Sequence, residues 1–589
     1  MLNEGSINVR LLVILGIIGL FGIVTIALTA ATLGTVNKRL DTIDNKLSAL
    51  ETNPTVMTTM SATTSTSTTT IATTNTMRPS QNQSLATSIN VTDVLKHLQE
   101  LQIIADKSNN TRAINTIGFN RTLQYIKDTL RNETNLNITE DSFKVRDFAL
   151  NTNPILISSI DGTIENYTYS SDAKKSDFLH VKYSNNSSVS TIHELNIIPN
   201  GGCKDTDWEN SKPDRVALIK RGGDCAFRDR ASQAAKYNAT GILFYNNGAS
   251  SDNMLPIEIT LAQENVLPAL FLSYRTGQDL ADTIQNSSSN VTVQLGIDLK
   301  LLPDFPVGNI CADTPTGDPT QTIVVGSHSD SVPAGPGIND NGSGSAANLG
   351  LAIALARLFQ TSTYAKYKYR VRFCWWGAEE IGLLGSDFHV KQAKLATTVG
   401  ERLQDYLVNL NYDMLGSPNY IFGIYDGRTA NNATPPLALP GSNKMSALYR
   451  DWFNEQKLPW DYTDFSGRSD YGPFLAEGIV AGGLFSGADE TKSFEQRDRY
   501  IKLLGQNAGG VAGAIQDPCY HKACDSIENI NEFAYEKMVQ AAAYVLEYLA
   551  RQNDLITWLY PNGRPTRTHD QSSQSKYNSI NEYFGLPYL

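Results

Sequence analysis

The stretch T-I-V-V-G-S-H-S-D-S at residues 322–331 decides the fold. Its first part, residues 322–326, is a short apolar run typical of a buried β-strand, and His328 and Asp330 follow it directly. In open α/β sheets, ligands gather at the carboxyl ends of the strands. We therefore expect a sheet whose strand ends carry ligand-type side chains, although a lone His-x-Asp also fits a structural role.

Strand and helix patterns alternate along the chain from residue 305 onward. Residues 346–359 predict a helix rich in Ala and Leu, and residues 369–376 and 406–412 predict two further strands. Such alternation is typical of an α/β domain whose sheet is covered by helices on both faces. Polar motifs come directly after several of these strands, as they do after the first.

Four further segments each place a metal-type ligand at a strand end or in a loop. The candidates are Asp340 in a glycine-rich loop, Glu379 and Glu380 after residues 369–376, Asp413 after residues 406–412, and His521 between Cys519 and Cys524. A carboxylate pair that ends a buried strand is costly without compensation, and two cations would supply it. Taken singly, each segment also fits a structural role, such as a helix cap, a turn or an idle surface pair.

Taken together, the five segments match those of a known family motif for motif. The chain resembles the zinc exopeptidase family of di-zinc aminopeptidases: the secreted bacterial leucine-type enzymes over residues 305–549, and the vacuolar aminopeptidase Y type over residues 91–549. The resemblance implies a mixed, mostly parallel sheet with helices on both faces. It also implies two Zn²⁺ ions per chain, with His328 and Asp413 on one ion, Glu380 and His521 on the other, and Asp340 bridging them.

The same resemblance implies roles for three neighbouring residues. Glu379 is the expected general base, Asp330 lies behind His328, and Tyr520 donates to the oxyanion. Elementary chemistry agrees, because nitrogen and oxygen ligands suit Zn²⁺, and a carboxylate beside the metals can move a proton from water to the leaving amine. We therefore expect a metallo-aminopeptidase that hydrolyses the N-terminal peptide bond of peptides or proteins with a free N-terminus.

Substrate-side residues are expected from two further motifs. Residues 467–474 resemble the family's substrate-side loop, which implies that Arg468 contacts the substrate backbone; an ion pair with Asp470 is the alternative. Phe485 is expected to wall the pocket for the first side chain. Met414, next to Asp413, is a further substrate-side candidate.

Residues 166–299 have a different sequence pattern, with short apolar runs that predict a β-rich unit inserted into the larger domain. The motifs at residues 202–203 and 221–227 are similar to those of the protease-associated domain, which implies a Cys203–Cys225 disulfide. The spacing of Cys519 and Cys524 favours a local disulfide over a zinc site in an oxidising compartment. For Cys311 and Cys374, on two strand candidates, a pair of buried thiols and a third disulfide both stay open.

Three other functions fit the sequence less well than that of an aminopeptidase. Di-zinc carboxypeptidases share the same pair of domains, but they add a helical dimerisation domain for which too few residues follow His521. A receptor-like homologue would have lost its metals, whereas every ligand position here is filled. Glutaminyl cyclisation on a related fold usually relies on one metal, so the metal content distinguishes it.

Residues 11–36 form an uncharged apolar run that exceeds the roughly 20 residues needed to span a bilayer. The run predicts a single-pass signal anchor, with cleavage to a secreted form as the alternative. Basic residues flank both ends, so sequons decide the orientation: they predict a type II membrane glycoprotein with an extracellular or lumenal catalytic domain, at the cell surface or in a vacuole or lysosome. The sequons include Asn82, Asn90, Asn120, Asn132, Asn137, Asn166, Asn186, Asn238 and Asn290.

The chain is thus expected to divide into eight segments. They are a cytoplasmic tail (1–10), the anchor (11–36), a helical stalk (37–53), a Thr/Ser-rich linker (54–90), the first part of the catalytic domain (91–165), the protease-associated domain (166–299), the catalytic di-zinc domain (300–550) and a tail without clear periodicity (551–589). The stalk either self-associates or is an amphipathic helix without partners, so the oligomeric state stays open. A net charge of −11 argues against nucleic acid as a partner.

Overall fold

The computed structural model describes residues 84–222, 225–249, 252–261, 267–286, 290–430 and 434–565. The predicted anchor at residues 11–36 and the predicted stalk at residues 37–53 lie outside these ranges, as does the chain beyond residue 565. Within the described ranges, no helix is both long and apolar enough to cross a membrane.

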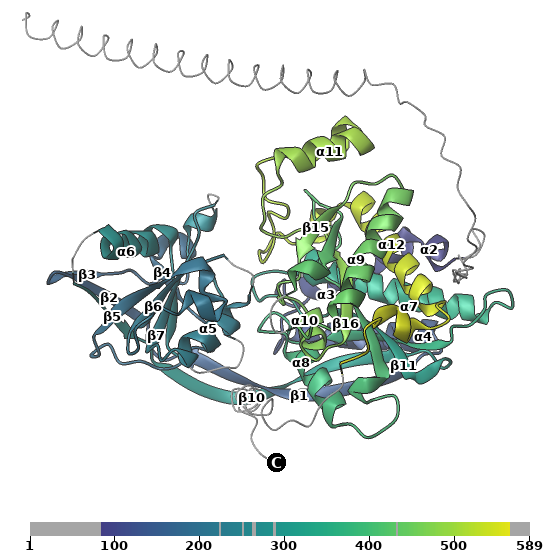
Figure 1. The fold of residues 1–589 in the computed structure, drawn as a ribbon, viewed down its shortest axis with the longest axis horizontal. Helices are drawn as coiled ribbons and strands as arrows, with labels where there is room; N and C mark the ends of the chain where they lie inside the picture. Colours follow the sequence, from purple (N-terminus) through teal and green to yellow (C-terminus); the bar gives the residue numbers. More distant parts are fainter. Residues whose placement is uncertain are drawn as a thin grey trace, which may run out of the picture. The chain divides into compact units, whose positions relative to one another are not determined.

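An eight-stranded sheet forms the frame of the larger domain (Figure 1). From edge to edge, its strands are β1 (Asn137–Leu150), β10 (Leu299–Asp313), β12 (Tyr369–Trp376), β11 (Asp318–His328), β13 (Tyr406–Tyr412), β16 (Val480–Phe485), β14 (Gly423–Asp426) and β15 (Asp461–Asp464). The four central strands β12, β11, β13 and β16 are parallel, whereas β1 and β10 pair antiparallel at one edge and β14 pairs antiparallel with β16. The predicted mixed α/β sheet is therefore present.

The central strand β12 shows how the sheet is covered on both faces. All of its residues are buried, and successive side chains point to opposite faces. Phe373 and Trp375 join the larger hydrophobic core, and Cys374 and Trp376 join a smaller one. Helices α3 (Val91–Asp106), α4 (Ile117–Glu133), α7 (Gly344–Gln360), α9 (Leu439–Glu455) and α12 (Glu532–Ala550) contribute to the larger core, and α8 (Leu384–Leu395) and α10 (Tyr471–Ala476) to the smaller.

A second eight-stranded sheet lies in the inserted unit, between β1 and β10 in the chain (Figure 1). Its strands, from edge to edge, are β3 (Thr163–Asn166), β2 (Ile155–Ile160), β9 (Val291–Gly296), β5 (His193–Ile198), β6 (Val216–Lys220), β7 (Gly241–Tyr245), β8 (Ala269–Leu272) and β4 (Phe178–His180), with helices α5 (Phe227–Lys236) and α6 (Tyr274–Asn286). The predicted start at residue 166 is therefore too late, because β2 pairs antiparallel with β9 along its length.

The folded part also starts earlier and ends later than the sequence patterns suggest. Helix α2 (Leu85–Ser88) falls within the predicted linker, yet Leu85 is buried and donates its N–H to Glu547 at 2.7 Å. At the other end, α13 (Leu555–Leu559) belongs to the predicted tail and packs Leu555 and Leu559 into the larger core. Segments this short carry too few residues for a periodic signal.

All six cysteines form disulfides. Cys203 pairs with Cys225 and Cys519 with Cys524, as the sequence predicts. Cys311 pairs with Cys374, which decides the alternative that the sequence leaves open. The two residues lie directly opposite each other on the antiparallel strands β10 and β12, so this bridge links neighbouring strands of the main sheet.

Candidate metal centre and active site

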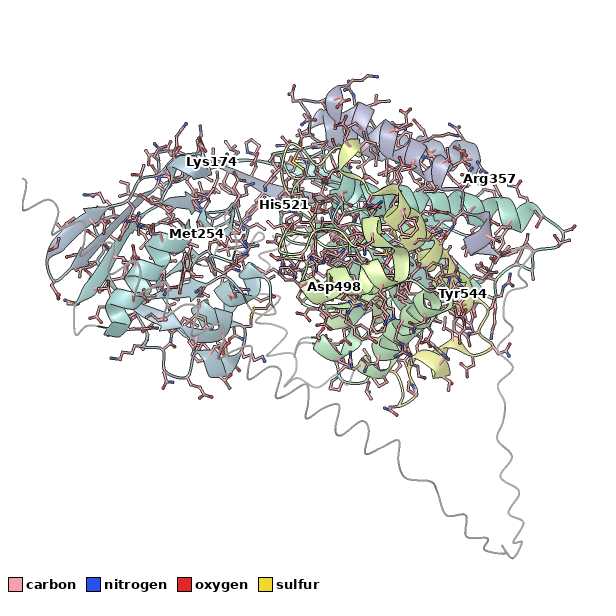
Figure 2. All side chains as sticks on the ribbon, turned by 90° about the horizontal axis from the view of Figure 1, so that it is seen from above. Lys174, Met254, Arg357, Asp498, His521 and Tyr544 are labelled. Carbon is pink, nitrogen blue, oxygen red and sulfur yellow. A yellow bond between two sulfur atoms is a disulfide. The ribbon has the colours of Figure 1, made fainter. Side chains whose placement is uncertain are left out.

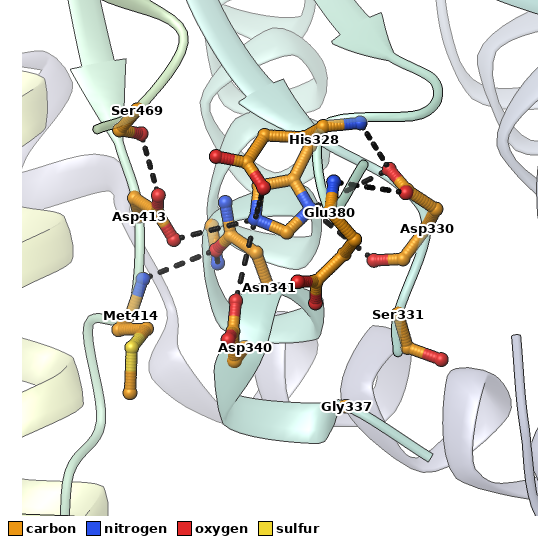
Figure 3. Close-up of polar contacts among 12 residues, drawn as sticks. His328, Asp330, Ser331, Gly337, Asp340, Asn341, Glu380, Asp413, Met414 and Ser469 are labelled. Carbon is orange, nitrogen blue, oxygen red and sulfur yellow. Dashed lines mark hydrogen bonds and ion pairs between the residues drawn. The ribbon is translucent and has the colours of Figure 1, made fainter. Parts of the chain in front are cut away.

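The five predicted ligands meet at the carboxyl ends of the central strands. His328 ends β11, Glu380 follows β12, and Asp413 follows β13, whereas Asp340 lies in the short segment η5 (Ile338–Ser343) before α7 and His521 comes from a loop. They form two groups that share one carboxylate: His328, Asp340 and Asp413, and Asp340, Glu380 and His521. In each group the candidate ligand atoms lie within 4.8 Å of one another. Four of the five are drawn in Figure 3, and Figure 2 labels His521 among the side chains of the larger domain.

His328 and Asp413 make the strand-borne half of the site. The Nε2 atom of His328 lies 3.3 Å from Asp340 Oδ1 and 3.4 Å from Asp413 Oδ1 (Figure 3). On the other side of the ring, Nδ1 lies 3.2 Å from the backbone carbonyl oxygen of Asp330. A proton on Nδ1 would therefore leave Nε2 free to bind a metal. Asp413 accepts a hydrogen bond from the Ser469 hydroxyl on Oδ2 only.

Glu380 and His521 make the loop-borne half. His521 Nε2 lies 3.1 Å from Glu380 Oε2 and 3.1 Å from Asp340 Oδ2. Asp340 thus turns one carboxylate oxygen toward His328 and the other toward His521, as expected for a bridging ligand. The side chain of His521 is 38% exposed, whereas that of His328 is 1% exposed. The Tyr520 ring stacks on that of His521, with 3.9 Å between the centroids.

A network of buried polar side chains positions Asp340. The Asp525 carboxylate accepts the backbone N–H groups of Asn339 at 2.8 Å and Asp340 at 3.0 Å. The Asn339 side chain donates to Asp517 at 2.6 Å, and Asn341 binds the carbonyl of Tyr412 at the end of β13. Sequence reasoning missed Asp517 and Asp525, although both lie within four residues of His521.

Arg112 is a second feature that sequence reasoning missed. This buried arginine, between α3 and α4, donates to the carbonyl oxygens of Ser329 at 2.6 Å, Pro336 at 2.8 Å and Gly337 at 2.6 Å. It thereby joins the two segments that carry His328 and Asp340. Burial lowers the pKa of Arg112 to about 10, although nearby carboxylates, Asp330 first among them, favour its charge. No local pattern marks this residue as part of the site.

Glu379 belongs to neither group of ligands. Its Oε2 atom lies 3.8 Å from His328 Nε2, and its side chain is 10% exposed. The Asp330 carboxylate accepts the backbone N–H groups of Glu379 at 3.2 Å and Glu380 at 3.3 Å (Figure 3). Asp330 Oδ1 also lies 3.6 Å from His328 Nδ1, so this carboxylate contacts both the His328 ring and the backbone of the Glu379–Glu380 pair.

The buried carboxylates of the site favour the binding of cations. Burial raises the pKa of Glu379 well above its usual range, despite the opposing effect of His328. Burial also raises the pKa of Glu380, and the nearby Asp340 carboxylate adds to this shift. For His521, the carboxylates of Glu380 and Asp340 outweigh burial and raise the pKa to about 10. So many carboxylates in one buried place are stable only with positive partners.

The three predicted substrate-side residues differ in their exposure and in their contacts. Arg468 is exposed, and both carboxylate oxygens of Asp470 are buried without a hydrogen-bond partner among the described residues, so the structure shows no bond between the two side chains. Phe485 stacks on Tyr425 with 6.3 Å between the ring centroids. Met414 is 2% exposed, so its side chain has little surface for a substrate; its backbone N–H instead binds Asn341 Oδ1 at 3.2 Å.

Comparison with known proteins gives the same picture. Residues 309–546 match peptidase family M28, and residues 189–280 match the PA domain. An aminopeptidase of Pseudomonas aeruginosa is 32% identical over 479 residues, covering 80% of this chain and 83% of that protein. The probable leucine aminopeptidase 2 of Arthroderma benhamiae is 37% identical over 359 residues, which span 61% of this chain and 66% of that relative's length.

The fold also resembles a solved structure. The aminopeptidase from Aneurinibacillus sp. strain AM-1 superposes with a TM-score of 0.53 at 20% identity, over 82% of this chain and 99% of that one. The main sheet, the inserted second sheet and the sequence matches agree with one another. The chain belongs to peptidase family M28 and carries a PA domain inserted between β1 and β10 of its main sheet.

Proposed function

We propose that this chain is a metallo-aminopeptidase that uses two zinc ions to remove N-terminal residues from peptides. The observation that carries the proposal is the pair of ligand groups that share Asp340. One carboxylate with its two oxygens turned toward different histidines, His328 and His521, suits two metals rather than one. The relatives named as aminopeptidases support the choice of reaction.

The residues present fit zinc. Each group offers one histidine nitrogen and carboxylate oxygens, which is the ligand set that Zn²⁺ prefers in hydrolases. Asp413 Oδ1 and Glu380 Oε1 are buried and have no hydrogen-bond partner among the described residues, as expected for atoms reserved for a metal. Zinc ions bound there would acidify a water molecule and polarise the scissile carbonyl.

Glu379 is the residue placed to move protons. Its Oε2 atom lies 3.8 Å from His328 Nε2 although Glu379 belongs to neither ligand group, and its raised pKa suits a group that accepts a proton from water and returns it to the leaving amine. Asp330 keeps this carboxylate in place through the backbone. Tyr520, beside His521, is the proposed donor to the developing oxyanion, and Arg468 the proposed contact for the substrate backbone.

We further propose that the catalytic domain is held outside the cytoplasm by residues 11–36 as a type II anchor. The uncharged apolar run and the three disulfides support this. The predicted glycosylation sites support it too, because every one within the described residues is exposed. They are Asn90, Asn120, Asn132, Asn137, Asn166, Asn186, Asn238 and Asn290.

A substrate panel combined with metal analysis tests the proposed reaction. We expect aminoacyl chromogenic substrates with a free α-amino group to be hydrolysed and their N-blocked counterparts to be inert, with about two zinc ions per chain. Activity on blocked substrates with a free C-terminus would mean a carboxypeptidase instead. A protein that binds no zinc and cleaves neither kind would mean a receptor-like homologue.

A further inference from the structure

The turn that carries Glu379 is closed by three backbone hydrogen bonds of its own. Between β12 and α8, the N–H groups of Gly382 and Leu383 both donate to the carbonyl of Glu379, at 2.8 and 2.9 Å. The N–H of Leu384 donates to the carbonyl of Ala378 at 3.1 Å. These bonds close the turn on itself, and the carbonyl groups of Ile381 and Gly382 accept none of them.

The PA domain satisfies those two carbonyl groups. Arg228, in the first turn of α5, donates from a guanidinium nitrogen to the Gly382 carbonyl at 2.8 Å. Thr260 donates its hydroxyl to the Ile381 carbonyl at 3.4 Å. The Arg228 side chain is only 18% exposed, so this charged hydrogen bond is largely shielded from water. Two residues of the inserted domain therefore contact the turn directly after Glu379 and Glu380.

Hydrogen bonds from both domains thus hold the turn. On the inner side, Asp330 accepts the N–H groups of Glu379 and Glu380, and on the outer side Arg228 and Thr260 donate to the carbonyls that follow. Asp330 also contacts His328, so the inner hydrogen bonds tie the turn to the metal ligands. Without the hydrogen bonds from Arg228 and Thr260, the turn could shift relative to Asp330 and the metal-ligand residues.

We propose that Arg228 of the PA domain is a positioning residue for Glu379. Arg228 acts through the Gly382 carbonyl and holds the proton-transferring carboxylate at its place beside the metal ligands. The inserted domain is therefore part of the catalytic apparatus, although none of its described residues belongs to either ligand group. This inference rests on the proposed role of Glu379 as general base.

Arg228→Ala in the full chain tests the proposal with two readouts. We expect kcat on an aminoacyl substrate to fall about tenfold with KM and zinc content unchanged, because small displacements of a reacting group are costly. We also expect faster hydrogen–deuterium exchange at the amides of Gly382, Leu383 and Leu384, since their bonds hold the turn closed. Arg228→Lys keeps a hydrogen-bond donor, so its kcat and its exchange rates in the turn should lie between those of wild type and Arg228→Ala.

Two control variants separate this role from others. Arg275→Ala removes an exposed arginine from α6 of the same domain and should change neither readout. Arg221→Ala breaks a different contact of the PA domain with the larger domain, its ion pair with Asp489. If Arg221→Ala opens the turn as much as Arg228→Ala does, docking of the whole domain explains the effect and the proposal is wrong.

The exchange readout also separates this proposal from the proposed function. If Arg228→Ala leaves exchange in the turn unchanged, the positioning role fails whatever reaction the protein catalyses. If exchange rises but kcat does not fall, Arg228 holds the turn without serving catalysis, and the proposal again fails. A wild-type protein that is inactive on every free-amino substrate contradicts the proposed function alone.

Discussion

The two halves of the candidate metal centre are built in different ways. His328 and Asp413 stand at the ends of neighbouring parallel strands, and His328 is 1% exposed. His521 instead comes from a loop, lies at a positive φ of 57°, and has a side chain that is 38% exposed. The strand-borne half is held by the core of the sheet, whereas the loop-borne half depends on local restraints.

The comparison teaches which changes each half should tolerate. A ligand at a strand end cannot move without shifting a packed sheet, because protein interiors are close-packed. A loop ligand can move as far as its restraints allow, and for His521 these include the Cys519–Cys524 disulfide. We therefore expect the loop-borne metal to be bound more weakly than the strand-borne one, and the following variants test this difference.

The shared carboxylate should give the largest effect. Asp340→Ala removes the candidate ligand that the two groups found among the described residues share, so we expect weaker binding of both metals and a loss of activity on the order of a thousandfold or more. Zinc content after dialysis and kcat/KM measure the two effects. If one metal stayed bound with unchanged affinity, Asp340 would serve a single half only.

Glu379→Gln separates chemistry from metal binding. Glu379 belongs to neither ligand group, so we expect a loss of kcat of about 10²- to 10⁴-fold while both zinc ions stay bound. Asp330→Asn is a useful companion, because the Asp330 carboxylate lies 3.6 Å from His328 Nδ1 and accepts the backbone N–H groups of Glu379 and Glu380. Loss of zinc from Glu379→Gln would show that this carboxylate is a ligand rather than a base.

His521→Ala and His328→Ala compare the two halves directly. We expect His521→Ala to lose the loop-borne zinc, with activity lower by roughly a hundredfold and little change in Tm. His328→Ala should lower Tm as well, because it leaves buried polar groups without a partner, at a cost of about 1–3 kcal/mol. Zinc titration and calorimetry measure both. Two ions bound to His521→Ala with unchanged affinity would mean that His521 is only a structural loop residue.

The smallest effect is expected from the disulfide of the loop. Cys519→Ser with Cys524→Ser frees the His521 loop but keeps its imidazole, so we expect a few-fold weaker loop-borne zinc and nearly unchanged global stability. The matched control is Cys311→Ser with Cys374→Ser, which opens the bridge between β10 and β12. That variant should lower Tm and leave the affinity of the loop-borne zinc unchanged.

The sequence predicted three of the four central strands, β11, β12 and β13, and the five residues that meet at the candidate metal centre, but not the supports of the site. Buried parallel strands appear in the sequence as apolar runs, and polar residues directly after such runs lie at the carboxyl ends of the strands, where ligands gather. Asp413 and Glu380 could be predicted as site residues for this reason. Met414 shows the limit of this reasoning. It directly follows the candidate ligand Asp413 and is still buried, and its backbone N–H donates a hydrogen bond to Asn341 Oδ1.

The sequence by itself predicted the α/β class and the inserted second unit from strand periodicity, and the five candidate ligands from closely spaced motifs that resemble those of a known family, because such patterns are local properties. Only the tertiary structure decided the boundary of that unit, the Cys311–Cys374 bridge and the parts played by Arg112 and Arg228. Both arginines act by donating to backbone carbonyls more than 150 residues away in the chain. A carbonyl is present at every residue, so no sequence pattern tells which one a side chain will meet.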